Sequence, residues 1–318
     1  MNTQEHFSIA FYNVENLFDA EHTEFTLDED FTPEGKLEWN AERYQLKLDH
    51  IAKVIAGIGA DEGANPPLFI GLAEVENDKV LLDLINQKEL SNYNYDFVHY
   101  ESPDERGVDV AFVYRKTFFE LNYSEVFPLM IYDQGQARDY TRDILLICGN
   151  LFGEKIYVIV NHWPSRSNGK SFTENKRMSG AKKVKEIINQ IYNETEDAVI
   201  FVIGDFNDSP KNQSIKQLVI QNNLINPMLD MQKKGLGSLI HLGKWHLFDQ
   251  IMFTENLLKK EKFTFEFAQI FNPEFLIEKN GRSKGSPLRT YNGSRYIGGY
   301  SDHFPVYAVF KKKETLPK

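Results

Sequence analysis

An acid and an amide follow directly after the most apolar segment of the chain, where they could bind and polarise a substrate. Residues 199–203 are five consecutive apolar residues, four of them β-branched, which is typical of a fully buried strand. Asp205 and Asn207 stand two positions apart just beyond Gly204, so both side chains can face the same way. The carboxyl end of a buried strand is a rigid support for chemistry in α/β proteins. Alternatively, the pair forms an Asx turn before a helix that starts near Gln213.

Polar groups stand at the ends of four further predicted strands. The apolar segments at residues 7–12, 68–73 and 156–160 run into Asn13, Glu74 and the pair Asn161-His162. Near the C-terminus, Ser301-Asp302-His303 leads into the apolar segment 304–310. One such polar residue is common in any soluble protein, whereas five groups of Asn, Glu, Asp or His indicate a shared site.

These groups and their order resemble the endonuclease/exonuclease/phosphatase superfamily, whose members are metal-dependent phosphodiesterases and phosphatases. The resemblance covers residues 11–306, nearly the whole chain, and Gly-Asp-Phe-Asn and Ser-Asp-His-Phe-Pro are its most specific parts. The histidine within Asn-His-Trp-Pro-Ser is similar to that of the two-histidine branch, which includes deoxyribonucleases and sphingomyelinase-like enzymes. The matching segments are Phe-Tyr-Asn-Val-Glu-Asn from Phe11, Gly-Leu-Ala-Glu-Val-Glu-Asn from Gly71, Asn-His-Trp-Pro-Ser-Arg from Asn161, Gly-Asp-Phe-Asn-Asp from Gly204, Phe-Asp-Gln-Ile-Met from Phe248 and Ser-Asp-His-Phe-Pro-Val from Ser301.

Cleavage of a phosphoric ester places negative charge on the phosphoryl oxygens and on the leaving oxygen, and a hard divalent cation neutralises it. We expect Glu74 to be the leading metal ligand, with Asn13, Asp205 and Asp302 as supporting oxygens. All-oxygen ligation selects Mg²⁺ or Mn²⁺. Zinc is disfavoured because the candidate histidines lie in neither a His-Glu-x-x-His nor a Cys-x-x-Cys motif. Alternatively, Glu74 is an ordinary acid near the start of a helix.

Histidine is the natural residue for acid–base chemistry near neutral pH. The resemblance implies that His303 and His162 act in catalysis, and that Asp249 orients the imidazole of His303. For His162 we expect Glu101 as the acidic partner, with Asp109 as the rival.

The proton of the attacking water has two possible acceptors, because the resemblance supports both His303 and Asp205. It also implies that Asn207 contacts the scissile phosphate as a neutral donor. Arg142 is expected to face the phosphate, with a salt bridge at a strand edge as an equal alternative. Arg166 and Arg289 are further candidates for phosphate binding.

The net charge of −10 is unfavourable for binding long nucleic acids, which rests on cations that face phosphates. However, two segments next to the histidine motifs are basic. Residues 163–177 carry four cations and one acid, and residues 279–295 carry five cations and no acid. Tyrosines 291, 296 and 300 interleave with the second set, as suits bases or sugars attached to a phosphate. We therefore expect a phosphodiester substrate, possibly a nucleic acid or nucleotide, bound at a basic rim. Alternatively, these segments are solvated surface loops.

The rest of the sequence predicts alternating strands and helices, which favours an α/β or α+β layered fold. Apolar residues recur at helical spacing in residues 40–58, 79–90 and 174–192, and further strands are expected at residues 95–100, 108–114, 144–150, 245–253 and 263–270. The resemblance implies a four-layer sandwich: two mixed β-sheets packed face to face, with helices on both outer faces and the site at one rim.

Composition favours one soluble globular domain over residues 1–318. The chain is 42% hydrophobic with a mean hydropathy of −0.44, and no linker or repeat divides it. No apolar stretch approaches the ~20 residues of a membrane helix, and the N-terminus lacks the design of a signal peptide. We expect a cytoplasmic monomer, or a secreted or periplasmic one if a leader has been removed. The single cysteine, Cys148, is expected to be buried and inert.

The sequence therefore predicts a metal-dependent hydrolase of phosphoric esters, most simply a phosphodiesterase or nuclease that cleaves P–O bonds by in-line attack of water. A sphingomyelinase-like enzyme and an inositol-phosphate-type phosphatase are the alternatives within this class. A catalytically silent binding scaffold is the alternative of another class. Loss of Glu74, Asp205 or His303 would have favoured the scaffold, but all three residues are present.

Overall fold

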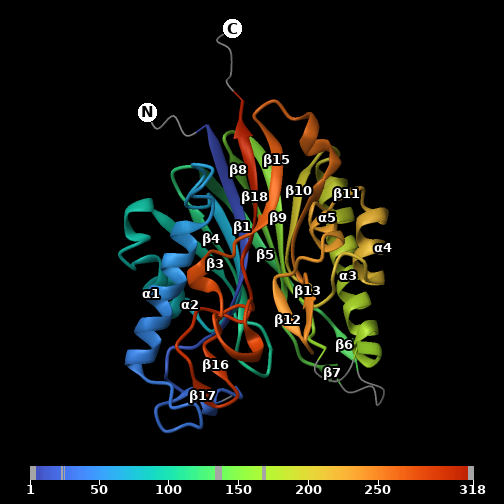
Figure 1. Ribbon diagram of the computed structural model, residues 1–318. Coiled ribbons are helices and arrows are strands. Elements are labelled where there is room, and N and C mark those ends of the chain that lie inside the picture. Colours follow the sequence, from blue (N-terminus) through green and yellow to red (C-terminus); the bar gives the residue numbers. More distant parts are fainter. Residues whose placement is uncertain (1–4, 23, 25, 133–137, 167–169, 314–318) are drawn as a thin grey trace.

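Two six-stranded mixed sheets pack face to face in a computed structural model that describes residues 5–313 except 23, 25, 133–137 and 167–169 (Figure 1). In the first sheet, β1 and β2 are parallel and the other neighbours are antiparallel. Its strands, in spatial order, are β15 (Phe263–Ile270), β18 (Val306–Lys312), β1 (His6–Leu17), β2 (Phe69–Val75), β4 (Asp109–Arg115) and β3 (Tyr95–His99).

The second sheet repeats this plan, with one parallel pair, β9 and β10, among antiparallel neighbours. Its strands, in spatial order, are β11 (Leu224–Ile225), β14 (Asp249–Thr254), β10 (Val199–Asp205), β9 (Glu154–His162), β8 (Ile144–Leu151) and β5 (Phe119–Phe127). Three short hairpins complete the strands: β6 (Ile131–Tyr132) with β7 (Arg138–Asp139), β12 (Leu239–His241) with β13 (Lys244–His246), and β16 (Tyr291–Asn292) with β17 (Arg295–Tyr296).

Helices cover the outer faces of both sheets, which confirms the predicted four-layer sandwich. Helices α1 (Ala41–Gly57) and α2 (Asp78–Ile85) lie outside the first sheet, and α3 (Lys170–Glu194) and α4 (Gln213–Gln221) lie outside the second (Figure 1). A shorter helix, α5, spans Met228–Lys233. The first two helices begin where the side chains of Asn40 and Asn77 accept hydrogen bonds from the backbone three residues later.

The core between the sheets is apolar and tightly packed. Phe201 of the second sheet packs against Phe69 and Phe310 of the first, with ring centroids 5.9 Å apart in both pairs. Gly71 on β2 lies close against the second sheet, because a Cβ there would stand 2.8 Å from the side chain of Ile203. This packing fixes one sheet relative to the other, and therefore fixes residues that the two sheets contribute to a common site.

One predicted strand is divided in the structure, and one strand of the second sheet was not predicted. The strand expected at residues 245–253 is divided into β13 and β14, because the backbone N–H of Leu247 donates to Oγ of Ser209 and leaves the strand pairing. Strand β5 was not predicted, since it is a half-exposed edge strand with little apolar pattern. Cys148 is buried on β8, as expected. None of the described helices combines the length and the apolar character needed to span a bilayer.

Candidate active site

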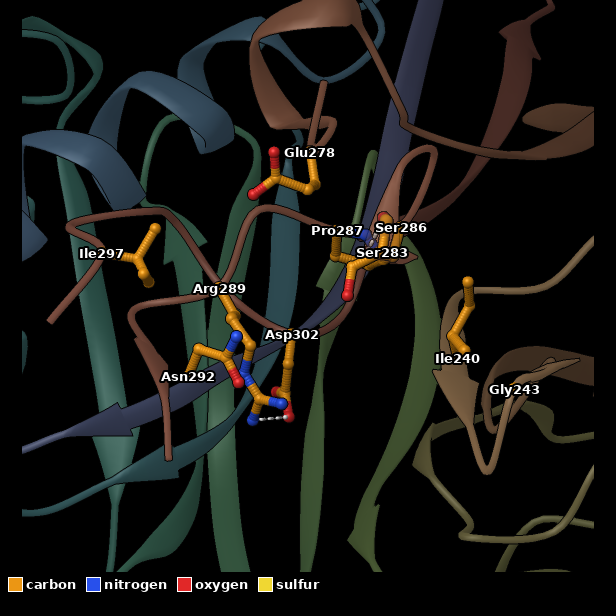
Figure 2. Close-up of a pocket in the computed structure, with 10 residues that line it drawn as sticks. All are labelled: Ile240, Gly243, Glu278, Ser283, Ser286, Pro287, Arg289, Asn292, Ile297 and Asp302. Atoms are coloured by element: carbon orange, nitrogen blue, oxygen red, sulfur yellow. Dashed lines mark hydrogen bonds and ion pairs between the residues drawn. The ribbon is translucent and has the colours of Figure 1, made fainter. Parts of the chain in front are cut away.

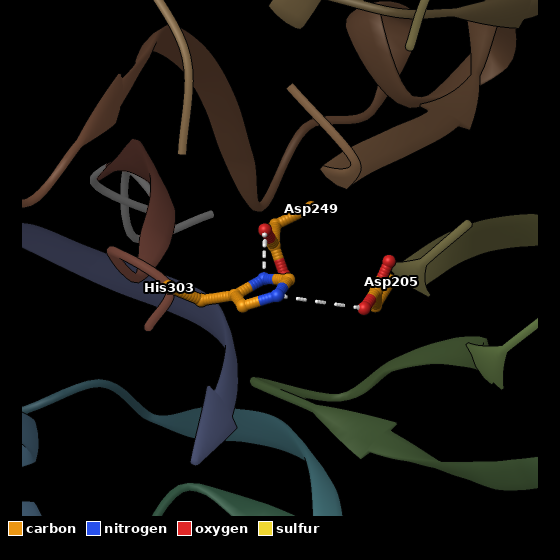
Figure 3. Close-up of side chains that lie close together, drawn as sticks. All are labelled: Asp205, Asp249 and His303. Atoms are coloured by element: carbon orange, nitrogen blue, oxygen red, sulfur yellow. Dashed lines mark hydrogen bonds and ion pairs between the residues drawn. The ribbon is translucent and has the colours of Figure 1, made fainter. Parts of the chain in front are cut away.

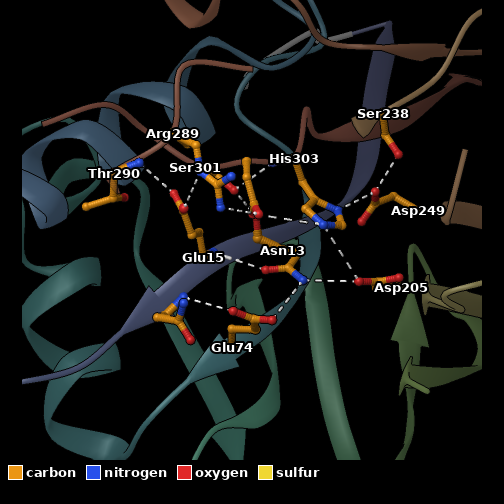
Figure 4. A network of polar contacts seen from close by, with 12 residues as sticks. Asn13, Glu15, Glu74, Asp205, Ser238, Asp249, Arg289, Thr290, Ser301 and His303 are labelled. Carbon is orange, nitrogen blue, oxygen red and sulfur yellow. Dashed lines mark hydrogen bonds and ion pairs between the residues drawn. The ribbon is translucent and has the colours of Figure 1, made fainter. Parts of the chain in front are cut away.

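The predicted polar residues meet at one rim of the sandwich because the strands that carry them end there together. Asp205 at the end of β10 is in register with His162 on β9 and with Asp249 on β14. Residues in register on neighbouring strands share one face of the sheet. From the first sheet, Nδ2 of Asn13 donates to Oδ2 of Asp205 at 3.1 Å and lies 3.4 Å from Oε1 of Glu74 (Figure 4). The two sheets thus contribute to one polar network.

His303 and Asp249 form a hydrogen-bonded pair at the centre of this network. Nδ1 of His303 lies 2.7 Å from Oδ2 of Asp249, and the same oxygen accepts from Oγ of Ser238 (Figures 3 and 4). This contact assigns the proton to Nδ1 and turns Nε2 toward the rim, 4.0 Å from Asp205. Burial would lower the pKa of His303, but the surrounding carboxylates, Asp249 first, outweigh it and raise the pKa well above its usual value.

Asp205 is a buried acid that titrates near neutrality. Burial, followed by the charge of Asp249, raises the pKa of Asp205 to about 7. Its Oδ1 accepts from the backbone N–H of Asn207 at 2.9 Å, while Oδ2 lies 3.7 Å from Nε2 of His162 and 4.0 Å from Nε2 of His303. Both candidate proton acceptors, Asp205 and His303, therefore lie in one coupled pair, where a proton can be shared.

Glu74 is held ionised in an electropositive environment. Burial would raise its pKa, but the positive charges of Arg106 and Arg142 outweigh burial and hold the pKa well below its usual value. Oε2 of Glu74 accepts from the backbone N–H of Asn16 at 3.0 Å and from Nη2 of Arg106 at 3.3 Å. Oε1 is 3.9 Å from Nε2 of His162. Arg106 was not predicted, because it lies in a loop whose sequence carries no recognisable motif.

The backbone is strained at the same place. Glu15, Asn16, Glu74 and Asn207 all have φ between 48° and 66°, a left-handed conformation that residues other than glycine rarely adopt. Such strain persists only where the surrounding structure imposes it, and it gathers at functional sites. Glu74 and Asn207, which the sequence selected for their side chains, are thus also held in conformations that cost stability.

Two arrangements at this rim could hold a metal ion. The carboxylates of Glu74 and Asp205 form a hard oxygen pair, which fits the family's divalent ion. Nδ2 of Asn13 contacts both carboxylates, while its amide oxygen accepts from the backbone N–H of Glu15 at 3.0 Å. Asp205, Asp249 and His303 also place one ligand atom each within 4.8 Å of one another. The pair of carboxylates suits a hard cation better than a set that includes an imidazole nitrogen.

His162 is buried beside these acids but lacks the acidic partner that the sequence suggested. Burial, followed by the charge of Arg142, lowers its pKa well below the usual value, so the imidazole is neutral at pH 7. Among the described residues, none hydrogen-bonds to Nδ1 of His162. Glu101 is exposed, and Asp109 instead accepts from Ser102 and faces His99 at 3.5 Å. The structure thus brings neither acid to His162.

The four predicted phosphate-binding residues occupy different environments. Arg142 is buried, with Nε 3.1 Å from Asp104, and it influences the pKa of both Glu74 and His162. Nδ2 of Asn207 donates to the carbonyl oxygen of Trp163 at 2.9 Å, at the mouth of the network.

Arg166 and Arg289 are both engaged within the protein. Nε of Arg166 donates to the carbonyl oxygen of Asn207 at 2.7 Å, Nη2 pairs with Asp208, and the guanidinium stacks on Phe248. Its side chain is only 8% exposed, so it supports Asn207 from behind and does not face solvent.

Arg289 is half exposed and lies nearer the rim. Its Nε is 3.3 Å from Glu15, and its Nη2 is 3.1 Å from Oδ2 of Asp302. Asp302 therefore faces Arg289, and its other oxygen is 4.0 Å from Nε2 of His303. No contact joins Asp302 to Glu74 among the described residues.

The prediction that three tyrosines line the basic rim is wrong. Tyr291 and Tyr300 are buried, the first donating to the carbonyl oxygen of Leu37 and the second stacked on His50. Tyr296 lies under the guanidinium of Arg43. These rings pack against α1 and the residues just before it, because the segment that carries them folds back over that helix. The side chains of Lys170 and Arg282 lie outside the described part of the chain.

Two residues that the sequence did not single out hold the site together. Nζ of Lys47 on α1, 2% exposed, donates to Oγ1 of Thr290 at 2.6 Å and to the carbonyl oxygen of Tyr300 at 2.7 Å. Oγ of Ser238 donates to Asp249, and its carbonyl oxygen accepts from the backbone N–H of Phe304. A lysine within the apolar stripe of a helix was the available signal for Lys47.

Comparisons with known proteins agree with this geometry. The sequence model of the endonuclease/exonuclease/phosphatase family matches residues 8–312, whereas no curated protein matches the chain significantly. Similar solved structures include Danio rerio TDP2 complexed with single-strand DNA product (16% identity, 96% of this chain and 99% of that chain, TM-score 0.56). The human Nocturnin catalytic domain with bound sulfate (16%, 98% and 97%, 0.56) and a Bacteroides thetaiotaomicron mannosyl-6-phosphatase (16%, 95% and 98%, 0.56) are also similar. At these identities the structures show a shared fold.

Proposed function

We propose a function from one premise: the chain belongs to the endonuclease/exonuclease/phosphatase family, whose members hydrolyse phosphoric ester bonds. We propose that this protein cleaves the P–O bond of small phosphodiesters by in-line attack of water, with Mg²⁺ or Mn²⁺ as cofactor. The observation that carries the proposal is the meeting of Glu74, Asp205 and the Asp249–His303 pair at one rim of the sandwich.

The protonation state of each residue determines its proposed role. Asp205 and His303, whose facing atoms are 4.0 Å apart, share the proton that leaves the attacking water. Asp249 keeps the imidazole in the required tautomer. His162 is neutral, and it offers a hydrogen bond to a phosphoryl oxygen without adding charge. Asn207 offers its amide in the same way.

Glu74, with Asn13 and Asp205 beside it, would hold the divalent ion. The bound ion supplies charge neutralisation and orientation for the phosphate. Glu74 suits this role because it stays ionised far below neutral pH, so protons do not compete for its oxygens.

The charges at the rim favour a substrate with a single negative charge. Arg142 is opposed by Asp104, Arg106 by Glu74, and Arg289 by Glu15 and Asp302. His162 and Asn207 add no positive charge. A phosphodiester carries one charge and needs less compensation than the dianion of a phosphomonoester.

Nucleic acid is the second candidate substrate. Exposed Lys279, Lys284 and Arg295 lie in the segment that leads to His303, and the D. rerio TDP2 structure, similar in fold, contains single-strand DNA product. The buried tyrosines and the paired arginines argue for weak, salt-sensitive binding of such a polymer.

A substrate panel tests the proposal. Bis(p-nitrophenyl) phosphate, p-nitrophenyl phosphate, plasmid DNA, RNA, sphingomyelin and inositol phosphates are incubated with Mg²⁺, with Mn²⁺ and with EDTA. We expect metal-dependent hydrolysis of the diester, and slower hydrolysis of the monoester. If no phosphoric ester is hydrolysed with either metal, the proposal is wrong.

A further inference from the structure

A cavity of about 330 Å³ opens beside the proposed catalytic centre (Figure 2). Its floor carries the Arg289–Asp302 ion pair, and Asp302 directly precedes His303. Its volume is at the lower end of the range for small-molecule sites, about 300–1,000 Å³. The cavity therefore has the size of a site for one small chemical group. It lies next to the proposed catalytic histidine, because Oδ1 of its lining residue Asp302 is 4.0 Å from Nε2 of His303.

The lining mixes hydrogen-bonding groups with aliphatic surface. Glu278, Ser283, Ser286 and Asn292 contribute polar side chains. Ile240, Pro287 and Ile297 contribute the apolar wall. Such a combination matches a sugar or polyol, whose hydroxyl groups need donors and acceptors while its C–H faces need apolar contact.

The charges of the described lining residues make a second phosphate a less favourable occupant than a neutral group. Glu278 and Asp302 are acids that line it, and Arg289 is its only cationic lining residue among the described residues. Arg289 is already opposed by both Glu15 and Asp302. An additional anion would face an excess of carboxylates, and like charges repel. A neutral group avoids this cost.

The cavity walls are fixed relative to His303. On one side, the hairpin of β12 and β13 is tied to the site because Ser238, just before β12, binds both Asp249 and the backbone N–H of Phe304. On the other side, Leu288 donates to the carbonyl oxygen of Leu276, which closes the segment around Ser283 and Ser286. A group bound here would have a defined position relative to the reacting phosphate, as preorganised binding requires.

We propose that this cavity binds a neutral, hydroxyl-bearing group of monosaccharide size that is esterified to the phosphate. The inference rests on the proposed phosphodiesterase function and names the class of substrate: a phosphodiester of a sugar or polyol. The hydroxyl groups of the substrate exchange hydrogen bonds with Asn292 and Glu278, while Ile240 and Ile297 contact its apolar faces.

Two chromogenic diesters test the inference. Both carry p-nitrophenol as the leaving group, and the second ester is methyl in one compound and the 6-position of glucose in the other. We expect kcat/KM for the glucose ester to exceed that for the methyl ester by about tenfold or more, as two or three added hydrogen bonds to neutral groups would give. If the protein hydrolyses neither compound, the proposed function itself is wrong. Equal kcat/KM for both would overturn only the cavity inference.

Three variants in the cavity lining identify the occupant. Asn292→Ala removes a hydrogen-bonding group, and exposed Ile297→Trp fills the space; each should lower kcat/KM for the glucose ester about five- to tenfold and leave the methyl ester within twofold. Glu278→Gln keeps an acceptor oxygen and removes one charge, so it should lower kcat/KM for the glucose ester less than Asn292→Ala does. If the wild type instead prefers a glucose ester that carries a second phosphate, the cavity binds an anion and the inference is wrong. Circular dichroism checks that each variant is folded.

Discussion

Nδ1 of His303 lies 2.7 Å from Oδ2 of Asp249, although 54 positions separate the two residues in the chain. Asp249 is in register with Asp205 on the neighbouring strand, and Asp205 faces the other nitrogen of the same imidazole at 4.0 Å. The histidine is thus placed between two acids with different tasks. One acid fixes the proton on Nδ1, and the other lies near Nε2, where we propose that it takes part in proton transfer.

Replacing Asp249 tests this division. Asp249→Asn presents an amide that can donate to Nδ1, which favours the wrong tautomer of His303. We expect kcat for a chromogenic diester to fall roughly 10²–10⁴-fold, with an unchanged circular dichroism spectrum. Asp230→Asn is the matched control, because Asp230 is exposed and pairs only with Lys233 among the described residues. Near wild-type turnover of Asp249→Asn would show that the catalytic histidine is elsewhere.

Glu74→Gln tests the proposed metal site. The variant loses the charge that attracts the cation, and its amide N–H groups oppose Asn16 and Arg106, which donate to Oε2. We expect the affinity for Mn²⁺, measured by isothermal titration calorimetry, to fall about 10–100-fold or more. Activity of the wild type should vanish in EDTA and return with Mg²⁺ or Mn²⁺. Full activity in chelator, or unchanged Mn²⁺ binding by Glu74→Gln, contradicts this assignment.

Lys47→Met tests the tether between α1 and the segment that carries Arg289. Burial lowers the pKa of Lys47 to about 8, yet its Nζ still satisfies Thr290 and the carbonyl oxygen of Tyr300. Methionine removes both hydrogen bonds and leaves Arg289, 3.3 Å away, as the cation that pairs with Glu15. We expect the free energy of unfolding, measured in urea, to fall by about 1–3 kcal/mol. Lys53→Met on the exposed side of the same helix should cost less than about 1 kcal/mol; equal losses would argue against a specific tether.

His99 gives a pH dependence of stability away from the catalytic centre. Burial would lower its pKa, but Asp109 and Asp78 outweigh burial and raise it. The folded protein thus favours protonated His99, so its contribution to stability is complete below the unfolded pKa of about 6.5. This contribution is lost as the pH rises through the folded pKa. The difference in unfolding free energy between wild type and His99→Gln should therefore be larger near pH ~6 than near pH ~9.

The exposure of Asp78 provides the control for this experiment. The side chain of Asp78 is 74% exposed, whereas that of Asp109 is 6% exposed. Solvent therefore screens the charge of Asp78 more than that of Asp109. Asp78→Asn should weaken the pH dependence less than Asp109→Asn. If the difference between wild type and His99→Gln does not vary with pH, the imidazole is not protonated in the fold.

Local patterns in the sequence predicted alternating strands and helices with polar residues at the strand ends, and the family resemblance implied the four layers. A buried strand that ends in Asp205, or a segment such as Ser301-Asp302-His303, is recognisable without knowing what lies opposite. The partners were not predictable in this way. Arg106 reaches Glu74 across 32 positions, and the tyrosines of the predicted rim are buried against α1. A basic residue in the sequence shows its charge, but only the fold shows which acid already neutralises it.

Arg166 is a further residue whose environment the sequence did not predict. Its contacts distinguish two possible roles, docking of the substrate and support of Asn207. As a docking cation it would need only its positive charge. In the structure its Nε donates to the carbonyl oxygen of Asn207, Nη2 reaches Asp208, and the guanidinium plane stacks on Phe248. Lysine keeps the charge but cannot reproduce this planar fork. Arg166→Lys should therefore lose nearly as much kcat as Arg166→Ala.

Steady-state kinetics on the methyl p-nitrophenyl diester distinguish these roles. Loss of support behind Asn207 would displace the amide that we propose contacts the phosphate in the transition state, so kcat should fall about tenfold or more in both variants. A docking role would instead raise KM, increase it most for polyanionic substrates, and be rescued by lysine. Exposed Arg295→Ala is the matched control, and it should leave kcat within twofold. A rise in KM alone that Arg166→Lys reverses would return Arg166 to the phosphate-binding surface and leave Asn207 supported by the hydrogen bond from its Nδ2 to Trp163.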